Sequence, residues 1–135
     1  MRVSVIDGQG GRLGRLIIEK IVERGIDCEL AAIGTNSAAT TAMLKAGAKQ
    51  GATGENPVCV AARTSDVIIA PIGVLAADAL MGEVTEKMAA AIGRSDAVKL
   101  LLPVNMCNNL VVGTQALTMA QLIDEAVNML EEICR

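Results

Sequence analysis

The sequence predicts an α/β fold in which helices cover both faces of one parallel sheet. Short apolar segments alternate along the chain with longer segments whose apolar residues recur every three or four positions, as strands and helices do. Residues 66–71 (DVIIAP) are apolar almost throughout, which is typical of a parallel strand buried on both faces. The length of 135 residues is that of one domain, so we expect a single domain over residues 1–135.

Strand, helix, strand and helix are expected in order in the first third of the chain. A β-branched strand comes first, and the apolar residues that follow the glycine cluster keep helical spacing until Gly25 ends the helix. After a second apolar strand, Asn36 or Ser37 caps a second helix, which ends at Gly47. These elements are expected at residues 2–6, 12–24, 28–33 and 38–46.

The same alternation continues to the end of the chain. Asn56 followed by Pro57 is typical of a helix start, and Thr85 and Thr118 are expected N-caps. The helical region that includes Thr85 is broken near Gly82. Strands are expected at residues 48–52, 66–71 and 98–104, with a small one at 110–112, and helices at residues 56–63, 74–92 and 118–134.

Right-handed crossovers between parallel strands leave few ways to order the sheet. We predict the order 3-2-1-4-5 with a short third strand, which is a Rossmann-like three-layer domain. A flavodoxin-like order, 2-1-3-4, is the alternative if residues 48–52 form only a loop.

The composition excludes several function classes. The chain has no His, Phe, Tyr or Trp, which rules out Ser-His-Asp and Cys-His sites, a tyrosine-based dehydrogenase site and aromatic stacking on nucleic-acid bases. A net charge of −3 gives no attraction to nucleic acid or to an anionic membrane. The longest uncharged stretch, residues 100–123, contains Pro, Asn and Gln and is no membrane span. We expect a cytoplasmic protein that binds neither nucleic acid nor membranes.

The strongest functional motif is the glycine turn DGQGGRLG, which follows a strand and begins a helix. Gly8, Gly11 and Gly14 have the GxxGxxG spacing; such glycines allow a tight turn whose N–H groups approach a phosphate at the positive end of the helix. The alternative is that they serve only turn geometry and close packing. The residues expected to bind a cofactor here are Gly8, Gln9, Gly10, Gly11, Arg12, Leu13 and Gly14.

The end of the second strand favours NADP over NAD. It reads Ile33-Gly34-Thr35-Asn36, without the Asp or Glu that holds a ribose 2′-hydroxyl. Thr35, Asn36 and Ser37 are instead expected to bond a 2′-phosphate, with Arg12 as its cation. Asp7, just before the turn, opposes a diphosphate unless a metal or an arginine compensates.

Ligands of open α/β sheets bind beyond the carboxyl ends of the strands. At those ends we expect Pro71, Ile72, Gly73 and Asn105 to join the cofactor site, although loop asparagines also serve local turns. Cys107 lies at the same edge, but without His or an adjacent cation it is interpreted as an incidental thiol. Asp7 with Asp78 or Glu55 is an alternative magnesium site, although no metal is expected.

Residues 3–70 resemble the front half of NAD(P)-binding Rossmann proteins, especially the NmrA-like atypical short-chain dehydrogenases. The resemblance lies in VIDGQGGRLG, MLKAGAKQGATGE and TSDVIIAP, and it implies that Gly8, Gly11, Arg12 and Gly14 bind the cofactor diphosphate. The whole chain also resembles a small family of firmicute proteins classed as a domain of unknown function, through DGQGG, IGTN, GATGEN, PIG and LPVN. That second resemblance implies no particular activity.

Two functions from different classes follow. The first is binding of NADP or another small phosphorylated nucleotide at residues 8–14, with oxidoreductase-like chemistry as one form of it, in a homo-oligomer. The second is a regulatory or protein-interaction module that keeps the Rossmann-like fold and catalyses nothing. A transferase that uses Cys107 is a weaker third alternative.

Overall fold

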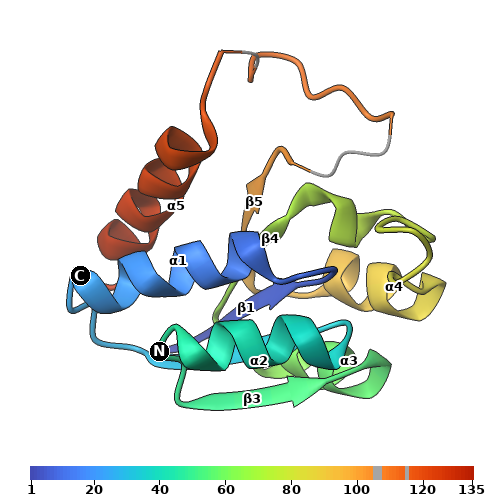
Figure 1. Cartoon of the computed structure of the whole chain (residues 1–135), viewed down its shortest axis with the longest axis horizontal. Coiled ribbons are helices and arrows are strands. Elements are labelled where there is room, and N and C mark those ends of the chain that lie inside the picture. Colours follow the sequence, from blue (N-terminus) through green and yellow to red (C-terminus); the bar gives the residue numbers. More distant parts are fainter. Residues whose placement is uncertain (105–107, 115) are drawn as a thin grey trace.

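The computed structural model describes residues 1–104, 108–114 and 116–135. These residues form one sheet of parallel strands in the order β3-β2-β1-β4-β5 (Figure 1). The predicted α/β Rossmann-like fold and its strand order are thereby confirmed, and the flavodoxin-like alternative is wrong because β3 pairs with β2 as an edge strand. The strands are β1 (Arg2–Asp7), β2 (Glu29–Gly34), β3 (Gln50–Thr53), β4 (Val67–Pro71) and β5 (Val98–Leu102).

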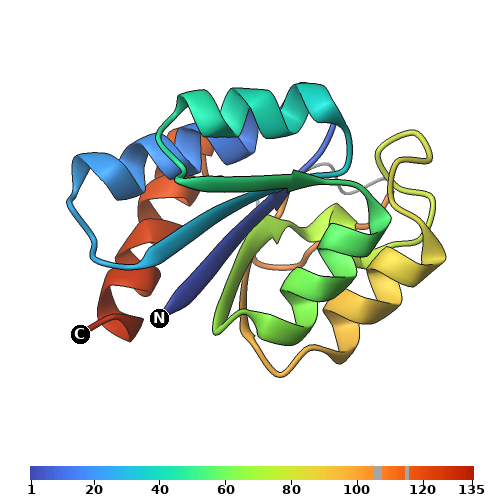
Figure 2. The ribbon, with the colours of Figure 1, turned by 90° about the horizontal axis from the view of Figure 1, so that it is seen from below.

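The helices form a layer on each face of the sheet. In Figures 1 and 2, α1, α2 and α5 lie on one face, and α3 and α4 lie together on the other. A short 3₁₀ helix, η1, follows β4 directly. The bounds are α1 (Arg12–Glu23), α2 (Ser37–Lys45), α3 (Glu55–Thr64), η1 (Ile72–Leu75), α4 (Glu86–Arg94) and α5 (Met119–Ile133).

The core has two halves, one on each side of the sheet. Alternate residues of a strand point to opposite faces, so β4 supplies both halves. Val67 and Ile69 pack under α1 and α5, whereas Ile68 and Ala70 pack under α3 and α4. All four side chains are fully buried. This explains why the β4 sequence is apolar throughout instead of alternating.

Residues 76–84 differ from the predicted broken helix of residues 74–92. Only η1 and α4 are helical, and Thr85 caps α4 as predicted, accepting a hydrogen bond from Met88 N at 3.1 Å. Between them, Asp78, Leu80 and Met81 have φ angles of 68°, 56° and 56°. These left-handed conformations interrupt a right-handed helix at each position, so the buried apolar side chains here, those of Ala79, Leu80 and Val84, belong to turns.

The expected strand at residues 110–112 is also absent, since these described residues form turns and irregular chain. Leu110 and Val112 are 88% and 92% exposed, and Gly113 has a φ of 91°. A strand needs a neighbour to satisfy its backbone, and high β-propensity alone does not supply one.

Two N-caps confirm the sequence reading of the helix starts. Asn36, rather than Ser37, caps α2 by accepting from Ala39 N at 2.9 Å. Thr118 caps α5 through a capping box with Gln121. Within the described part of the chain, no helix has the length and apolar character that crossing a bilayer requires.

Candidate functional site

The candidate site lies at the carboxyl ends of β1, β2 and β4. The chain leaves β1 toward β2 on one side, while β4 lies on the other side, so this edge is the point where the strand order reverses. The glycine turn, residues 8–14, connects β1 to α1 as predicted. Gly11 is the N-cap of α1 with a φ of 73°, and its N–H donates to Gly8 O at 2.9 Å.

Two glycines of the turn are required by packing between α1 and α2. A Cβ at Gly11 would lie 2.8 Å from Ala39 Cα and 2.9 Å from Ala39 O, which are backbone atoms that cannot move aside locally. A Cβ at Gly14 would collide with Met43 Sδ and lie 3.0 Å from Asp7 Cβ. Gly10 differs from both, because nothing lies within 4 Å of its Cβ position. Packing therefore accounts for Gly11 and Gly14 but not for Gly10.

The Asp7 carboxylate fills the inner side of the glycine turn. Asp7 is only 3% exposed, and its two oxygens accept hydrogen bonds from Gly8 N and Gly14 N, each at 2.8 Å. Burial raises the pKa of this carboxyl above its ordinary value; the two backbone hydrogen bonds act against that rise, and the charge of Glu83 adds to it. The N-cap residue Gly11 has no side chain that could accept a hydrogen bond from the first turn of α1. The Asp7 carboxylate caps the helix instead, by accepting from Gly14 N.

A second carboxylate, that of Glu83, occupies the outer side of the turn. Its Oε1 accepts hydrogen bonds from Gln9 N at 2.9 Å, Thr35 Oγ1 at 2.7 Å and Asn36 Nδ2 at 2.7 Å. Asn36 Nδ2 also donates to Gln9 O at 2.9 Å, which ties the β2 end to the turn. Three residues that were predicted to bind a cofactor thus come together around one internal anion.

The hydrogen bonds decide the ionisation of Glu83. Partial burial raises the pKa of this carboxyl, but the hydrogen bonds from Thr35, Gln9 and Asn36 outweigh burial and leave the pKa below its ordinary value. Glu83 is therefore ionised at neutral pH. Asp7 and Glu83 together make the turn an acidic place, with Arg12 exposed at the first position of α1.

The lowered pKa of Glu83 predicts a pH-dependent contribution to folding. Since the folded-state pKa lies below the unfolded-state value, the contribution is complete above the ordinary pKa and is lost as the pH falls through the folded one. We expect the difference in free energy of unfolding between the wild type and Glu83→Gln to be larger at about pH 7 than at about pH 3. Urea titrations followed by far-UV circular dichroism measure it, with exposed Glu86→Gln as control. Equal differences at both pH values would contradict the prediction.

The other predicted site residues are distributed as follows. Pro71 ends β4 and is buried, and Ile72 and Gly73 begin η1 at the same edge of the sheet. Leu13 is buried in the core, so only its backbone can face a ligand. Asn105 and Cys107 lie outside the described residues, so their predicted roles stay predictions.

The alternative magnesium site finds no support in the described chain. Both oxygens of Asp7 accept backbone hydrogen bonds, and Asp78 is exposed within residues 76–84 rather than in a helix. In residues 1–104, 108–114 and 116–135, no three Cys, Asp or Glu side chains gather closely enough to hold a metal ion.

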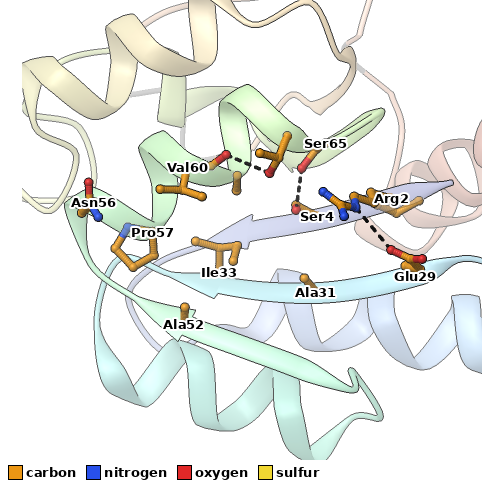
Figure 3. A pocket seen from close by; sticks show the side chains of 13 residues that line it. Arg2, Ser4, Glu29, Ala31, Ile33, Ala52, Asn56, Pro57, Val60 and Ser65 are labelled. Atoms are coloured by element: carbon orange, nitrogen blue, oxygen red, sulfur yellow. Dashed lines mark hydrogen bonds and ion pairs between the residues drawn. The ribbon is translucent and has the colours of Figure 1, made fainter.

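A separate groove of about 320 Å³ lies beside α3, on the face of the sheet that α3 and α4 cover (Figure 3). Ala31, Ile33 and Ala52 form its floor, and Pro57 and Val60 of α3 line one side. None of the predicted cofactor residues lines this groove. It is therefore distinct from the glycine turn.

Sequence reasoning missed Glu83 because nothing local marks it. It lies 74 residues after Gln9, in a segment predicted to be helical, and no motif links it to the β2 end. Gly82, where the sequence predicts a break in the helical region, offered a hint of a turn next to Glu83 but not of its contacts.

Comparison with known proteins yields one match. Searches of the curated proteins and of the solved structures gave no match. A family model described as "Domain of unknown function (DUF3842)" matches residues 2–135. The predicted resemblance of the whole chain to a domain of unknown function is thereby confirmed, and the chain belongs to the DUF3842 family.

Proposed function

We propose that this protein binds a small phosphorylated nucleotide at the carboxyl ends of β1 and β2, and that NADP is the first ligand to test. The observation that carries the proposal is the convergence of Gln9 N, Thr35 Oγ1 and Asn36 Nδ2 on a single anionic oxygen. Donors from two separate segments that meet at one point can hold an anion. We call the point where Gln9 N, Thr35 Oγ1 and Asn36 Nδ2 meet the anion seat. The seat lies at the strand-order reversal, where open α/β sheets bind ligands.

Further donors lie next to the seat. Among the described residues, none accepts a hydrogen bond from the backbone N–H groups of Gly10, Arg12 or Leu13. These groups lie at the start of α1, whose positive end attracts phosphate. The exposed Arg12 side chain adds a cation. In this arrangement Thr35 and Asn36 hold a 2′-phosphate, and the start of α1 holds the diphosphate.

The resemblance to NmrA-like short-chain dehydrogenases supports the same ligand class. Any redox step would use the hydride chemistry of the cofactor itself, because the chain has no His or Tyr. A homo-oligomer is part of this proposal, since Leu110 and Val112 are almost fully exposed and apolar.

Gly10 offers a clean test, since its open surroundings accept a side chain without disturbing the fold. Scanning calorimetry with NADP at about 100 times its dissociation constant should raise the wild-type Tm by roughly 5–12 °C. We expect Gly10→Asn to keep most of this shift, and Gly10→Asp, of the same shape but negative, to weaken binding by about tenfold or more. NAD, AMP and inorganic phosphate serve as comparison ligands. No shift with any of them, or equal shifts for both variants, would refute phosphate binding at the turn.

A regulatory or interaction module is the second candidate, and the exposed apolar side chains of Leu110 and Val112 favour it. This module would bind a partner rather than a nucleotide. This candidate predicts no nucleotide-induced Tm shift in the wild type, and it predicts that Leu110→Ser combined with Val112→Ser abolishes a stoichiometric complex with a protein other than this chain. Substitution of Gly10 therefore tests nucleotide binding, and substitution of Leu110 and Val112 tests partner binding.

A further inference from the structure

We infer that the Glu83 side chain is a built-in competitor for the anion seat, so that a ligand phosphate binds by displacing its carboxylate. The inference rests on the proposed function and adds a form of regulation to it.

The first argument is the chemistry of the seat. All three donors, Gln9 N, Thr35 Oγ1 and Asn36 Nδ2, bond the same carboxylate oxygen at 2.7–2.9 Å. A phosphate oxygen accepts the same kind of charge-assisted hydrogen bonds at the same distances. The second oxygen of Glu83 accepts no hydrogen bond from the described residues. One oxygen therefore makes the whole contact, and a phosphate oxygen can replace it.

The second argument is where Glu83 comes from. Its segment follows η1 on the β4 side (Figure 1), whereas the donors lie just after the carboxyl ends of β1 and β2, so the contact bridges the strand-order reversal. Gly8 makes room for it: a Cβ there would lie 2.9 Å from Glu83 Oε1 and 2.5 Å from Thr35 Oγ1. The closed contact thus lies at the strand-order reversal, where open α/β sheets bind ligands.

The third argument is that the side chain can leave while its backbone stays. On either side of Glu83, Leu80 and Val84 are 2% and 1% exposed and anchor the segment in the core. Glu83 itself is only half-buried, so rotation about its own side-chain bonds moves the carboxylate into water. The ligand therefore does not have to unfold residues 76–84.

The fourth argument is electrostatic. With Glu83 in place, the turn carries two carboxylates, and Asp7 cannot leave because it bonds Gly8 N and Gly14 N inside the fold. A phosphate approaching the closed seat meets like charge. Displacement of Glu83 into solvent removes the nearer of these charges, so binding and displacement occur together.

The test is isothermal titration calorimetry of NADP, and separately of inorganic pyrophosphate, into the wild type, Glu83→Gln and Glu83→Ala. If the open state is populated at about 10% or less, Glu83→Ala should bind about tenfold or more tightly than the wild type. Glu83→Gln should fall between them, because a neutral amide oxygen is a weaker competitor for the donors. Exposed Glu86→Ala, which removes a charge nearby but no contact to the seat, should bind as the wild type does.

Each other outcome overturns the inference in a recognisable way. Equal, measurable affinities for the wild type and Glu83→Ala would show that Glu83 does not compete, with the proposed function intact. Weaker binding by Glu83→Ala would make Glu83 a ligand contact, again with the proposed function intact. Absence of binding in every variant, with unchanged far-UV circular dichroism, would refute the proposed function and the competitor together.

Discussion

Replacement of Gly11 by alanine is expected to lower the free energy of unfolding by about 2–5 kcal/mol. Two effects add. A left-handed φ of 73° disfavours any residue with a Cβ, and that Cβ would lie 2.8 Å from the Ala39 backbone. Relief requires α1 and α2 to separate, which loosens the core beneath them. Urea unfolding followed by far-UV circular dichroism measures the loss.

Two other glycines separate these effects. Gly25 has a φ of 63° but nothing within 4 Å of its Cβ position, so Gly25→Ala should show only the backbone cost of about 1–2 kcal/mol. Gly10 has open space and no left-handed φ, so Gly10→Ala should change stability by less than about 0.5 kcal/mol. A Gly11→Ala effect no larger than that of Gly25→Ala would mean that the helices do not pack closely at Gly11.

Removal of the Asp7 carboxylate is the second large effect, and we expect Asp7→Ala to lower the free energy of unfolding by about 2–4 kcal/mol. Gly8 N and Gly14 N would lose their acceptor in a site that is only 3% exposed. Relief of a desolvated charge offsets part of the loss, since burial raises the pKa of Asp7. The same urea titrations measure the change.

Two variants check the Asp7 result. Asp7→Asn keeps one acceptor oxygen but turns an amide N–H₂ toward the other backbone N–H. Its free energy of unfolding should therefore be clearly lower than that of the wild type. Asp96→Ala removes an exposed aspartate and should be nearly neutral. Stability unchanged in Asp7→Ala would mean that water replaces the carboxylate at the turn, and that Asp7 does not cap α1.

The fold could be predicted from the sequence because its signals are local and repeated. The fully apolar β4 and the glycine turn between β1 and α1 each specify their own conformation. The strand order then followed from the handedness of crossovers. Residues 76–84 could not be predicted in the same way. Buried Leu80 and Val84 resemble a helical pattern, and only the surrounding core selects left-handed turns for this segment.

The candidate site was predictable in part for the same reason. The strand–turn–helix motif placed Gln9, Thr35 and Asn36 at one edge of the sheet, and the structure brings them together. Their present partner, Glu83, is a long-range contact without sequence periodicity. The interpretation of the glycines was likewise incomplete: Gly11 and Gly14 are explained by contacts with α2, which spacing within the turn does not reveal.

The position of Asp7 divides the glycine turn into two halves with separate tasks. The inner half, Gly8 N and Gly14 N bonded to Asp7, belongs to the architecture of the domain, while the outer half consists of Gln9, whose N–H bonds Glu83, and of exposed Gly10, whose N–H has no acceptor among the described residues. If the turn binds an anion as proposed, substitutions on the outer half change that binding while the helix start remains intact. Gly10 can accept a side chain without loss of folding stability, whereas Asp7, Gly11 and Gly14 are held fixed by the fold itself.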